Sequence, residues 1–425
     1  MQSIQSIRGM HDLLPDITPT WRWLESQLAD LFAAYDFREI RIPLVEKAEL
    51  FTRAIGQATD VVEKEMYAFA DRNGDTLALR PEGTAGVVRA AIQHGMLASP
   101  GLKLWYQGPM FRHERPQRGR QRKFHQFGAE VFGLPGPDVD AELIALGERI
   151  WKRLGIAESI RLEINTLGDR EDRQRYRARL IEFLKPHEAD LDADSRRRLE
   201  SNPLRIFDSK NPQTQAIIAD APRLADTLGD DAREHFEEFR SLLDALGIEY
   251  SVNPGLVRGL DYYSRTVFEW ITDDLGAQGT VCAGGRYDGL VAIQGGKDTP
   301  GIGFALGVER LIELLSKEGA EHSCYPHVYL VCQAPIAEGL RLAEELRENL
   351  PALVLSLHLG GGSFKSQFKR ADRSGARYAL VLGESEVADG VCKIKDLRGE
   401  RPQETISLSN LTARLTQLLS ELDAD

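Results

Sequence analysis

The chain has few cysteines and no pair of them at metal-binding spacing. Its 425 residues include four, and none belongs to a Cys-x-x-Cys pair. No histidine stands at zinc-finger spacing either, so we expect no structural zinc. Scattered thiols in a chain of this length are typical of a reducing compartment. The four are Cys282, Cys324, Cys332 and Cys392.

Long apolar stretches are also missing. No apolar run approaches the roughly 20 residues that a membrane-spanning helix needs. The N-terminus has no signal-peptide pattern, and the chain has no internal repeat or low-complexity tract. We therefore expect a cytoplasmic protein with no membrane partner.

A net positive charge is absent, because 53 Lys and Arg face 65 Asp and Glu and give a formal charge of −12. This balance argues against a protein that binds nucleic acid through its whole surface, so any polyanion must meet local basic patches. With 42% hydrophobic residues the chain can bury a core. Its length predicts about two to four domains.

The first three hundred or so residues mix helix and strand patterns. Residues 16–35 have apolar positions at helical spacing, and residues 37–43 alternate as a strand that ends in proline. Residues 102–112 and 123–132 predict two strands joined by a long basic arm. Residues 169–250 are helical in pattern and rich in charge, which indicates an insertion.

Strand patterns return at 256–290, and a helix follows at about 304–317. Residues 317–326 contain glycine and proline and indicate a linker. Beyond it, short apolar runs alternate with helical stretches, which predicts a small α/β domain with a largely parallel sheet. The runs begin at Val328, Ala352 and Tyr378, and the helical stretches span 336–349, 363–374 and 409–422.

The segment from Leu256 to Tyr263 places an arginine, a carboxylate and two phenols beside a glycine, where the pattern predicts a buried strand. Polar and charged groups in such a place are costly unless they meet a ligand or a partner. Arg258 is therefore a candidate for ligand binding. A structural pair of Arg258 with Asp261 is the simpler alternative.

Strand alternation along residues 124–130 places Gln126, Gly128 and Glu130 on one face, and Phe127 and Ala129 on the other. Two polar groups that flank a glycine predict a slot for a small polar ligand. An exposed strand face is the alternative.

Glu82 and Thr84 flank Gly83 directly after a proline. A carboxylate and a hydroxyl at such a turn can hold an ammonium group. They can also cap a helix that begins near Ala85, and both roles can coexist.

Two basic clusters are candidates for contact with RNA phosphates. Six of the twelve residues from Arg112 to Lys123 are basic, against one acid, Glu114. In the C-terminal part, basic residues recur at i, i+4 and i+8 and so share one helical face. A solvated surface is the alternative in both cases. The second cluster consists of Lys365, Lys369 and Arg373.

Five motifs in order resemble those of histidyl-tRNA synthetases, which are class II aminoacyl-tRNA synthetases. The resemblance runs from Arg8 to the C-terminus, and the ordered set is specific although each motif alone is weak. The motifs are Arg80-Pro81-Glu82-Gly83-Thr84, Phe111-Arg112-His113-Glu114, Leu256-Val257-Arg258-Gly259-Leu260-Asp261-Tyr262-Tyr263, Ala283-Gly284-Gly285-Arg286-Tyr287-Asp288-Gly289 and Gly301-Ile302-Gly303-Phe304-Ala305-Leu306-Gly307-Val308-Glu309-Arg310.

The resemblance implies an α/β protein whose α+β catalytic domain has the antiparallel sheet of class II synthetases. It implies a discontinuous catalytic domain at 1–168 and 251–322, a helical insertion at 169–250 and an anticodon-binding α/β domain at 326–425. The unit at residues 16–43 resembles class II motif 1, which implies a homodimer. An ordinary edge strand is the alternative for the strand of that unit.

The resemblance also implies the reaction: L-histidine is activated with ATP and joined to tRNA(His). Arg258 would lie between the histidine carboxylate and the α-phosphate, and Arg112 would grip that phosphate. Both are the catalytic candidates, because a fixed cation offsets the charge that builds as the carboxylate attacks phosphorus. Mg²⁺ would be bound mainly through the ATP phosphates, with no protein ligand assigned.

The implied binding residues form three sets. Besides Arg112 and Arg258, the ATP set contains Glu114 and Arg310, which contact adenine. The histidine set consists of Glu82, Thr84, Gln126, Glu130, Tyr262, Tyr263 and Tyr287, and the tRNA set of Arg115, Arg118, Arg120, Arg122, Lys365, Lys369 and Arg373.

Two other functions are weighed against this one. Synthetase-like regulatory subunits of histidine biosynthesis share the catalytic fold and bind without aminoacylating. They typically lack the first histidine motif and the C-terminal domain, and both are present here. A class II synthetase for another amino acid is the third candidate, and Glu130, Tyr262 and Tyr263 argue against it.

Overall fold

The computed structural model describes residues 3–56, 59–117, 119–201, 203–257, 260, 262–276, 279–317, 319, 322, 325–399 and 401–422. The chain divides into two compact units, Met1–His322 and Ser323–Asp425. Among the described residues, no helix is both long and apolar enough to cross a membrane. The boundaries predicted for a separate insertion at 169–250 stay a prediction.

An eight-stranded sheet in the order β1-β5-β6-β11-β10-β9-β7-β8 forms the centre of the first unit. Its inner pairs are antiparallel, and the pairs at the two edges are parallel. The predicted antiparallel sheet is thereby confirmed. The strands are β1 Arg38–Glu39, β5 Leu102–Phe111, β6 Lys123–Phe132, β7 Arg161–Thr166, β8 Ser251–Val252, β9 Ser264–Ile271, β10 Thr280–Arg286 and β11 Gly301–Gly307.

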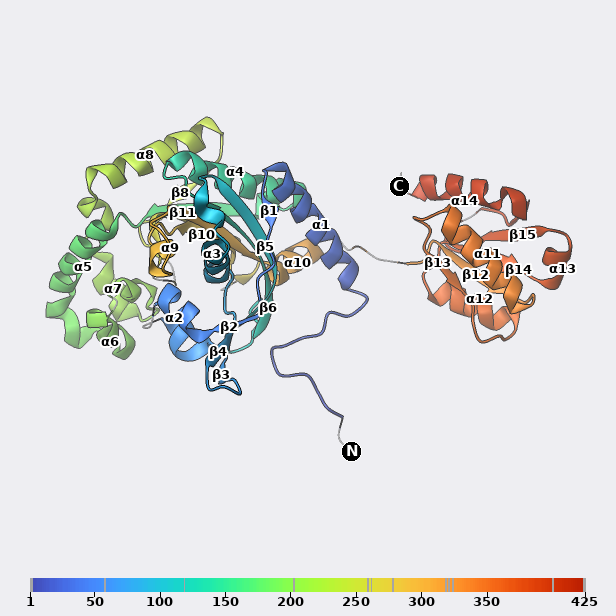
Figure 1. Cartoon of the computed structure of the whole chain (residues 1–425), viewed down its shortest axis with the longest axis horizontal. Coiled ribbons are helices and arrows are strands. Elements are labelled where there is room, and N and C mark those ends of the chain that lie inside the picture. Colours follow the sequence, from blue (N-terminus) through green and yellow to red (C-terminus); the bar gives the residue numbers. More distant parts are fainter. Residues whose placement is uncertain are drawn as a thin grey trace. The chain divides into compact units, whose positions relative to one another are not determined.

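Four helices share one apolar core with one face of this sheet (Figure 1). In the first of them, Trp21, Leu24, Leu28 and Phe32 recur at helical spacing, and all four are buried. This apolar stripe is the reason the segment forms a helix that lies on the sheet. The helices are α1 Thr18–Ala34, α4 Pro137–Leu154, α8 Asp230–Ala245 and α10 Val308–Lys317.

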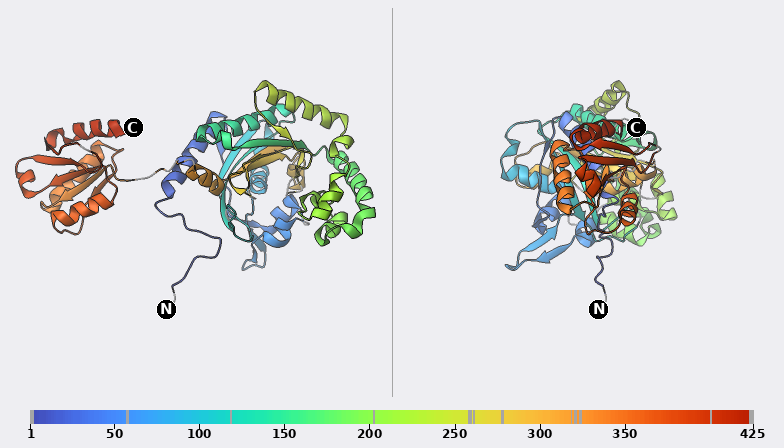
Figure 2. Two further views of the ribbon diagram at one scale, coloured as in Figure 1. Left: turned by 180° about the vertical axis from the view of Figure 1, so that it is seen from behind. Right: turned by 90° about the vertical axis from the view of Figure 1, so that its right-hand side faces the viewer.

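A second core lies on the other face of the eight-stranded sheet. Residues of the segment 169–250, which was predicted to be helical, contribute to this core. A three-stranded sheet in the order β2-β4-β3, coloured blue in Figure 2, contacts α2. The helices of this side are α2 Ala48–Ile55, α3 Thr84–Gln93, α5 Arg170–Leu184, α6 Ala193–Ser201, α7 Pro212–Ala219 and α9 Leu290–Ile293, and the strands are β2 Val45–Lys47, β3 Ala68–Ala70 and β4 Thr76–Leu79. Short helical turns are η1 Val61–Glu65, η2 Met96–Ala98, η3 Ala157–Ser159, η4 Lys185–Asp190, η5 Pro203–Asp208 and η6 Leu224–Thr227.

The second unit has a five-stranded sheet in the order β13-β12-β14-β15-β16. Its larger core includes residues of α11 and α14, and a smaller core includes residues of α12. The strands are β12 Val328–Cys332, β13 Leu355–Leu357, β14 Tyr378–Leu382, β15 Val391–Asp396 and β16 Glu404–Ser407. The helices are α11 Ile336–Asn349, α12 Phe364–Arg373, α13 Glu384–Ala388 and α14 Leu408–Leu422.

The parallel part of this second sheet is confirmed, since β12 pairs in parallel with β13 and β14. The antiparallel strands β15 and β16 were not predicted. In the first unit, residues 304–307 belong to β11 and the helix begins only at Val308. β11 pairs with β6 on one side and with β10 on the other, which holds these residues in the sheet, so the helix starts later than predicted.

Two predicted strands of the first unit are wrong in extent or in kind. The strand expected at 37–43 is reduced to β1, whose two residues pair with β5. The described residues of the segment 256–263 form no strand. Tyr262 and Tyr263 are adjacent and both buried, and a pleated strand would turn one of them away.

Candidate active site

A cavity of about 310 Å³ opens among β6, β10, β11, the start of α3 and the loop that carries Tyr262 and Tyr263. This volume lies in the range of small-molecule sites. The sequence motifs that converge on it are far apart along the chain. Ten of the predicted site residues line it: Glu82, Thr84, Arg112, Glu114, Arg120, Gln126, Tyr262, Tyr263, Tyr287 and Arg310.

Glu82 holds the first turn of α3. Its carboxylate accepts the backbone N–H groups of Thr84 at 2.7 Å and of Ala85 at 2.9 Å. Burial raises the pKa of Glu82, while these hydrogen bonds and the charge of Arg112 act in the opposite direction. The predicted helix cap is therefore present, and the same carboxylate lines the cavity.

Glu130 contacts the cavity indirectly, because it accepts hydrogen bonds from two hydroxyl groups that line the cavity. The carboxyl of this residue, which is 1% exposed, accepts a hydrogen bond from Thr84 Oγ1 at 2.7 Å and another from the Tyr287 hydroxyl. Burial raises the pKa of Glu130 from 4.5 to about 8, against these two hydrogen bonds. A carboxyl with this pKa can change its charge when a ligand enters.

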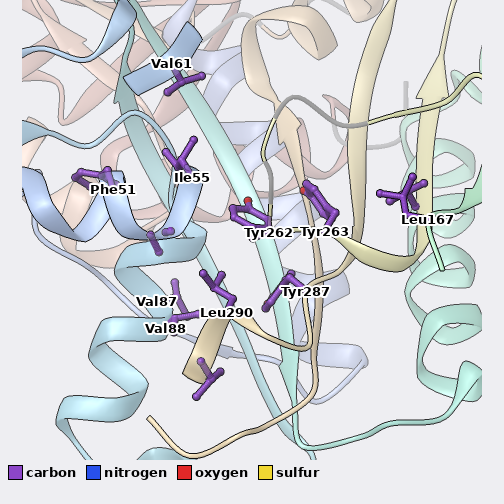
Figure 3. Close-up of a cluster of buried hydrophobic side chains, with 14 of the residues drawn as sticks. Phe51, Ile55, Val61, Val87, Val88, Leu167, Tyr262, Tyr263, Tyr287 and Leu290 are labelled. Carbon is purple, nitrogen blue, oxygen red and sulfur yellow. The ribbon is translucent and has the colours of Figure 1, made fainter. Parts of the chain in front are cut away.

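Three tyrosines gather beside Glu130. Figure 3 shows Tyr262, Tyr263 and Tyr287 close together, with Leu290 of α9 near them. The ring centroids of Tyr262 and Tyr263 are 4.7 Å apart, and those of Tyr262 and Tyr287 are 5.7 Å apart. Burial is the main cause that raises the pKa of Tyr262 and of Tyr287 well above 10. These phenols therefore stay neutral and can donate hydrogen bonds.

Tyr106 of β5 is a cavity residue that the sequence did not single out. Its ring lies where a side chain at Gly83 or at Gly128 would be, since a Cβ there would stand 2.1 Å or 2.2 Å from a ring carbon. The prediction of an open slot above Gly128 is therefore wrong, because the Tyr106 ring fills this space. Gln126 lines the cavity and Glu130 accepts hydrogen bonds from two residues that line it, whereas Phe127 belongs to the core of the opposite face.

Three arginines form the basic part of the cavity. Arg112 donates to the Pro81 carbonyl at 2.9 Å and lies over the Phe124 ring. Arg310 donates to the carbonyls of Gly119 and Thr280. Burial lowers the pKa of Arg310, and the charges of Arg120 and Arg112 lower it further. These guanidinium groups repel one another, and a bound polyanion such as a chain of phosphates would offset that repulsion.

The basic arm at residues 112–123 is held by an ion pair and hydrogen bonds, which a solvated run of charged residues would not make. Arg120 pairs with the buried carboxylate of Glu114 and lines the cavity. Arg122 donates from Nε to the Glu114 carbonyl at 3.1 Å and from its backbone N–H to the Gly9 carbonyl at 2.8 Å. Arg115 is exposed. Arg258 and Arg118 lie outside the described residues.

His125 and Glu309 form a pair that the sequence reasoning missed. The Glu309 carboxylate accepts the backbone N–H of His125 at 2.9 Å and lies 2.8 Å from His125 Nδ1. The signal available was the acid directly before Arg310 in the last motif.

Within the described part of the chain, no group of three or more His, Cys, Asp or Glu side chains could hold a metal ion.

In the second unit, the predicted basic face exists as an exposed surface. Lys365, Lys369 and Arg373 lie on α12, and all three are exposed. Gln367 and Ala371 on the opposite side of the helix are buried. The Ser363 hydroxyl caps this helix, directly after three glycines with positive φ.

The sheet and its cavity define the catalytic domain of a class II aminoacyl-tRNA synthetase. The family model described as histidyl-tRNA synthetase matches residues 9–311, and the one described as anticodon binding domain matches residues 328–418. The chain belongs to the histidyl-tRNA synthetase family. It is 57% identical over 419 residues to a histidine–tRNA ligase of Halorhodospira halophila, with 98% of this chain and 99% of the relative covered.

Solved structures agree with this assignment. The apo histidyl-tRNA synthetase of S. aureus superposes with a TM-score of 0.81 at 36% identity, over 97% of this chain and 99% of that one. An ATP phosphoribosyltransferase regulatory subunit/histidyl-tRNA synthetase from Bacillus halodurans has a TM-score of 0.64 at 21% identity, over 90% and 98%. At that identity the second likeness shows the fold alone.

Proposed function

We propose that this chain is a histidine–tRNA ligase that forms histidyl-adenylate from L-histidine and ATP and transfers the histidyl group to the 3′ end of tRNA(His). The observation that carries the proposal is the identity of 57% to a histidine–tRNA ligase over nearly the whole chain, anticodon-binding domain included. The match across that domain leaves the regulatory alternative without support. Because tRNA is the substrate, we place the protein in the cytoplasm.

Histidine would bind at the end of the cavity that holds carboxylates and phenols. The α-ammonium group fits Glu82, Thr84 and Gln126, which line this end. The imidazole fits Tyr263, Tyr287 and the Glu130 carboxyl, which accepts a hydrogen bond from the Tyr287 hydroxyl. A carboxylate also accepts a hydrogen bond from a ring N–H. Such buried polar recognition discriminates strongly against side chains that leave these groups unpaired.

ATP would bind at the basic end. Arg112 and Arg258 would meet the α-phosphate, while Glu114 and Arg310 would contact adenine. The histidine carboxylate then attacks the α-phosphorus in line. A mixed anhydride bond forms between a carboxylate oxygen and this phosphorus, the bond from the phosphorus to the α,β-bridging oxygen breaks, and pyrophosphate leaves. Fixed guanidinium groups offset the charge on the phosphoryl oxygens, so these residues need not move a proton.

Mg²⁺ is expected with ATP and would neutralise charge on its phosphates. The acids that line the cavity already have partners: Glu82 holds Thr84, Glu114 pairs with Arg120, and Glu309 holds His125. We therefore assign the metal to the phosphates and to none of these carboxylates.

ATP–pyrophosphate exchange with each of the twenty amino acids tests the proposal directly. We expect exchange with histidine alone, and aminoacylation of tRNA(His) with the same preparation. Exchange with a different amino acid would replace the proposed substrate. The complete absence of exchange, with histidine still bound, would favour a regulatory subunit.

Charge reversal on α12 is expected to weaken tRNA binding. Lys365→Glu with Lys369→Glu places negative charge on an exposed face that would meet RNA phosphates. The KM for tRNA(His) should rise, and its dependence on salt should become less steep, because each lost phosphate contact lowers the salt slope by about one. Aminoacylation kinetics at several salt concentrations measure both effects.

A matched control is Arg341→Glu with Arg347→Glu on α11, which makes the same change of charge on exposed side chains. This control should leave the tRNA KM near that of the wild type. The KM values for histidine and ATP should stay unchanged in both double variants. Equal tRNA kinetics for the two, at low salt, would show that the α12 face is only solvated.

The protein is expected to be a homodimer through the segment that ends at Pro43. Exposed apolar side chains gather along the chain at and around this segment, and burial against a second copy would remove them from water. Leu44→Glu should weaken the dimer, whereas Leu246→Glu on an exposed site elsewhere should not. Sedimentation equilibrium at micromolar concentration measures this, and an active wild-type monomer would contradict it. The exposed side chains are Ile4, Ile7, Leu14, Ile17, Leu44 and Val45.

A further inference from the structure

A fully buried ion pair lies directly behind the histidine end of the cavity. Asp140 of α4 and Arg286 at the end of β10 are both 0% exposed, and Asp140 Oδ1 lies 2.7 Å from Arg286 Nη2. Burying two charges costs several kcal/mol per ion before their attraction is counted. The pair is therefore weak as a source of stability, and its position next to Tyr287 suggests another role.

Arg286 fixes the strand end that carries Tyr287. Its Nε donates to Asp140 Oδ2 at 3.1 Å, and its Nη1 donates to the Leu134 carbonyl at 3.1 Å. Nη1 also donates to Asp288 Oδ1 at 3.2 Å, and Nη2 donates to the Gly136 carbonyl. A guanidinium has five N–H groups in one plane, so this set of partners leaves it a single orientation.

The backbone on both sides of Tyr287 is held by the same group. Asp288, a partner of Arg286, accepts the N–H of Gly301 at 3.1 Å, and the N–H of Tyr287 donates to the Gly301 carbonyl at 2.8 Å. The Tyr287 ring lies against Gly301, where a Cβ would stand 2.4 Å away. Thus Arg286 and Asp288 determine where the Tyr287 hydroxyl meets Glu130.

Asp140 also connects this group to the helical segment at 169–250. Its Oδ2 accepts Thr266 Oγ1 at 2.6 Å and lies 2.9 Å from Nε2 of His235 on α8. The other ring nitrogen of His235 lies 3.4 Å from Arg265 Nη1. Arg265 in turn donates to Asp169, the N-cap of α5, at 2.7 Å and 3.1 Å.

We propose that Asp140 and Arg286 are positioning residues that orient the Tyr287 hydroxyl toward Glu130, and that His235 ties this orientation to the helical segment between α5 and α8. The inference rests on the proposed histidine site. It adds residues that touch no substrate and act through Tyr287. It requires that the pair affect histidine binding more than ATP binding, since the basic end of the cavity is formed by other residues.

A double-mutant cycle tests the route through Tyr287. Asp140→Asn is expected to raise the histidine KM in pyrophosphate exchange about tenfold, with the ATP KM within about twofold of wild type. In a Tyr287→Phe background the same substitution should change the histidine KM by less than about twofold, because the hydroxyl it orients is gone. Fully additive effects would overturn the inference.

The cycle separates this inference from the function on which it rests. If Tyr287→Phe alone leaves the histidine KM unchanged, the proposed histidine site is wrong at this residue. If Tyr287→Phe raises it and Asp140→Asn does not, only the positioning role fails. Asp138→Asn, an exposed carboxylate on the same helical turn, is the matched control and should behave as wild type.

An apolar replacement distinguishes positioning from folding. Asp140→Leu with Arg286→Met removes both charges together, which often leaves a fold as stable as before. We expect this double variant to fold with a lowered melting temperature, because the Leu134 and Gly136 carbonyls lose their donor, and still to show a raised histidine KM. A folded double variant with a wild-type histidine KM would overturn the proposal.

Milder variants cover the case in which these changes prevent folding. Thr266→Val removes one hydrogen bond to Asp140 Oδ2 and keeps the side-chain shape. His235→Ala removes the link to α8, whereas His235→Gln can keep a donor toward Asp140. We expect Thr266→Val and His235→Ala to raise the histidine KM, with partial rescue by His235→Gln. Unchanged histidine KM values in both Thr266→Val and His235→Ala would overturn the proposal.

Discussion

Arg258→Ala is expected to reduce adenylation by roughly 10²–10³-fold or more, which is the usual cost of losing one preorganised charge at a reacting centre. The residue is proposed to lie between the carboxylate of histidine and the α-phosphate of ATP, two anions that must approach each other. Arg112 is proposed to grip the α-phosphate and Arg310 to contact adenine, so neither replaces a cation between the reactants. Histidine binding should therefore persist in part while chemistry is lost.

Single-turnover formation of histidyl-adenylate measures this effect, and calorimetry measures histidine binding in the same variant. Arg258→Lys should recover part of the rate, because it restores charge without the planar fork. Arg161→Ala removes an exposed arginine of β7 and serves as the control. Pyrophosphate exchange near the wild-type rate in Arg258→Ala would contradict the catalytic assignment.

Glu130→Gln is expected to raise the histidine KM by about tenfold or more, since each tenfold corresponds to about 1.4 kcal/mol of lost binding. Burial holds the pKa of this carboxyl at about 8 in the empty site. A hydrogen bond from an imidazole N–H favours the ionised form, which the amide cannot adopt. Glu163→Gln on β7 is the control, and unchanged histidine affinity by calorimetry would remove Glu130 from recognition.

Glu130→Gln is also expected to change how the stability of the folded protein depends on pH. The folded pKa of Glu130 is raised to about 8 from 4.5, so between these values the folded state keeps a proton that the unfolded state has released. The contribution of this group is fully present below about pH 4.5 and is lost as the pH rises toward 8. The Tm of the ligand-free wild type should therefore fall relative to that of Glu130→Gln across this window. Parallel curves of Tm against pH would show that the carboxyl titrates normally.

Much of the local structure could be predicted because it depends on short-range periodicity. The stripe of Trp21, Leu24 and Leu28 predicts α1, and the alternation from Phe124 to Glu130 predicts that Gln126 and Phe127 of β6 face opposite sides of the sheet. Each of the ten proposed site residues at the cavity belongs to a short motif that the sequence shows, although the folding of the whole unit brings these motifs together.

Register and long-range contact could not be predicted in this way. Tyr106 is opposite Gly128 because β5 pairs with β6 in one register, and a shift by one residue would turn the ring to the other face. The loop with Tyr262 and Tyr263 looked like a strand, since its apolar residues alone do not reveal that both rings point inward.

What the sequence by itself determined is the family, the order of the motifs, the elements with strong periodicity and the basic face of α12. Only the tertiary structure decided which groups meet. The contact of Asp140 with Arg286 joins residues 146 positions apart, and Tyr287 meets Glu130 across 157 positions. Such pairs carry no local pattern, because a buried charge or hydroxyl acquires its partner only when the sheet and the helices have packed.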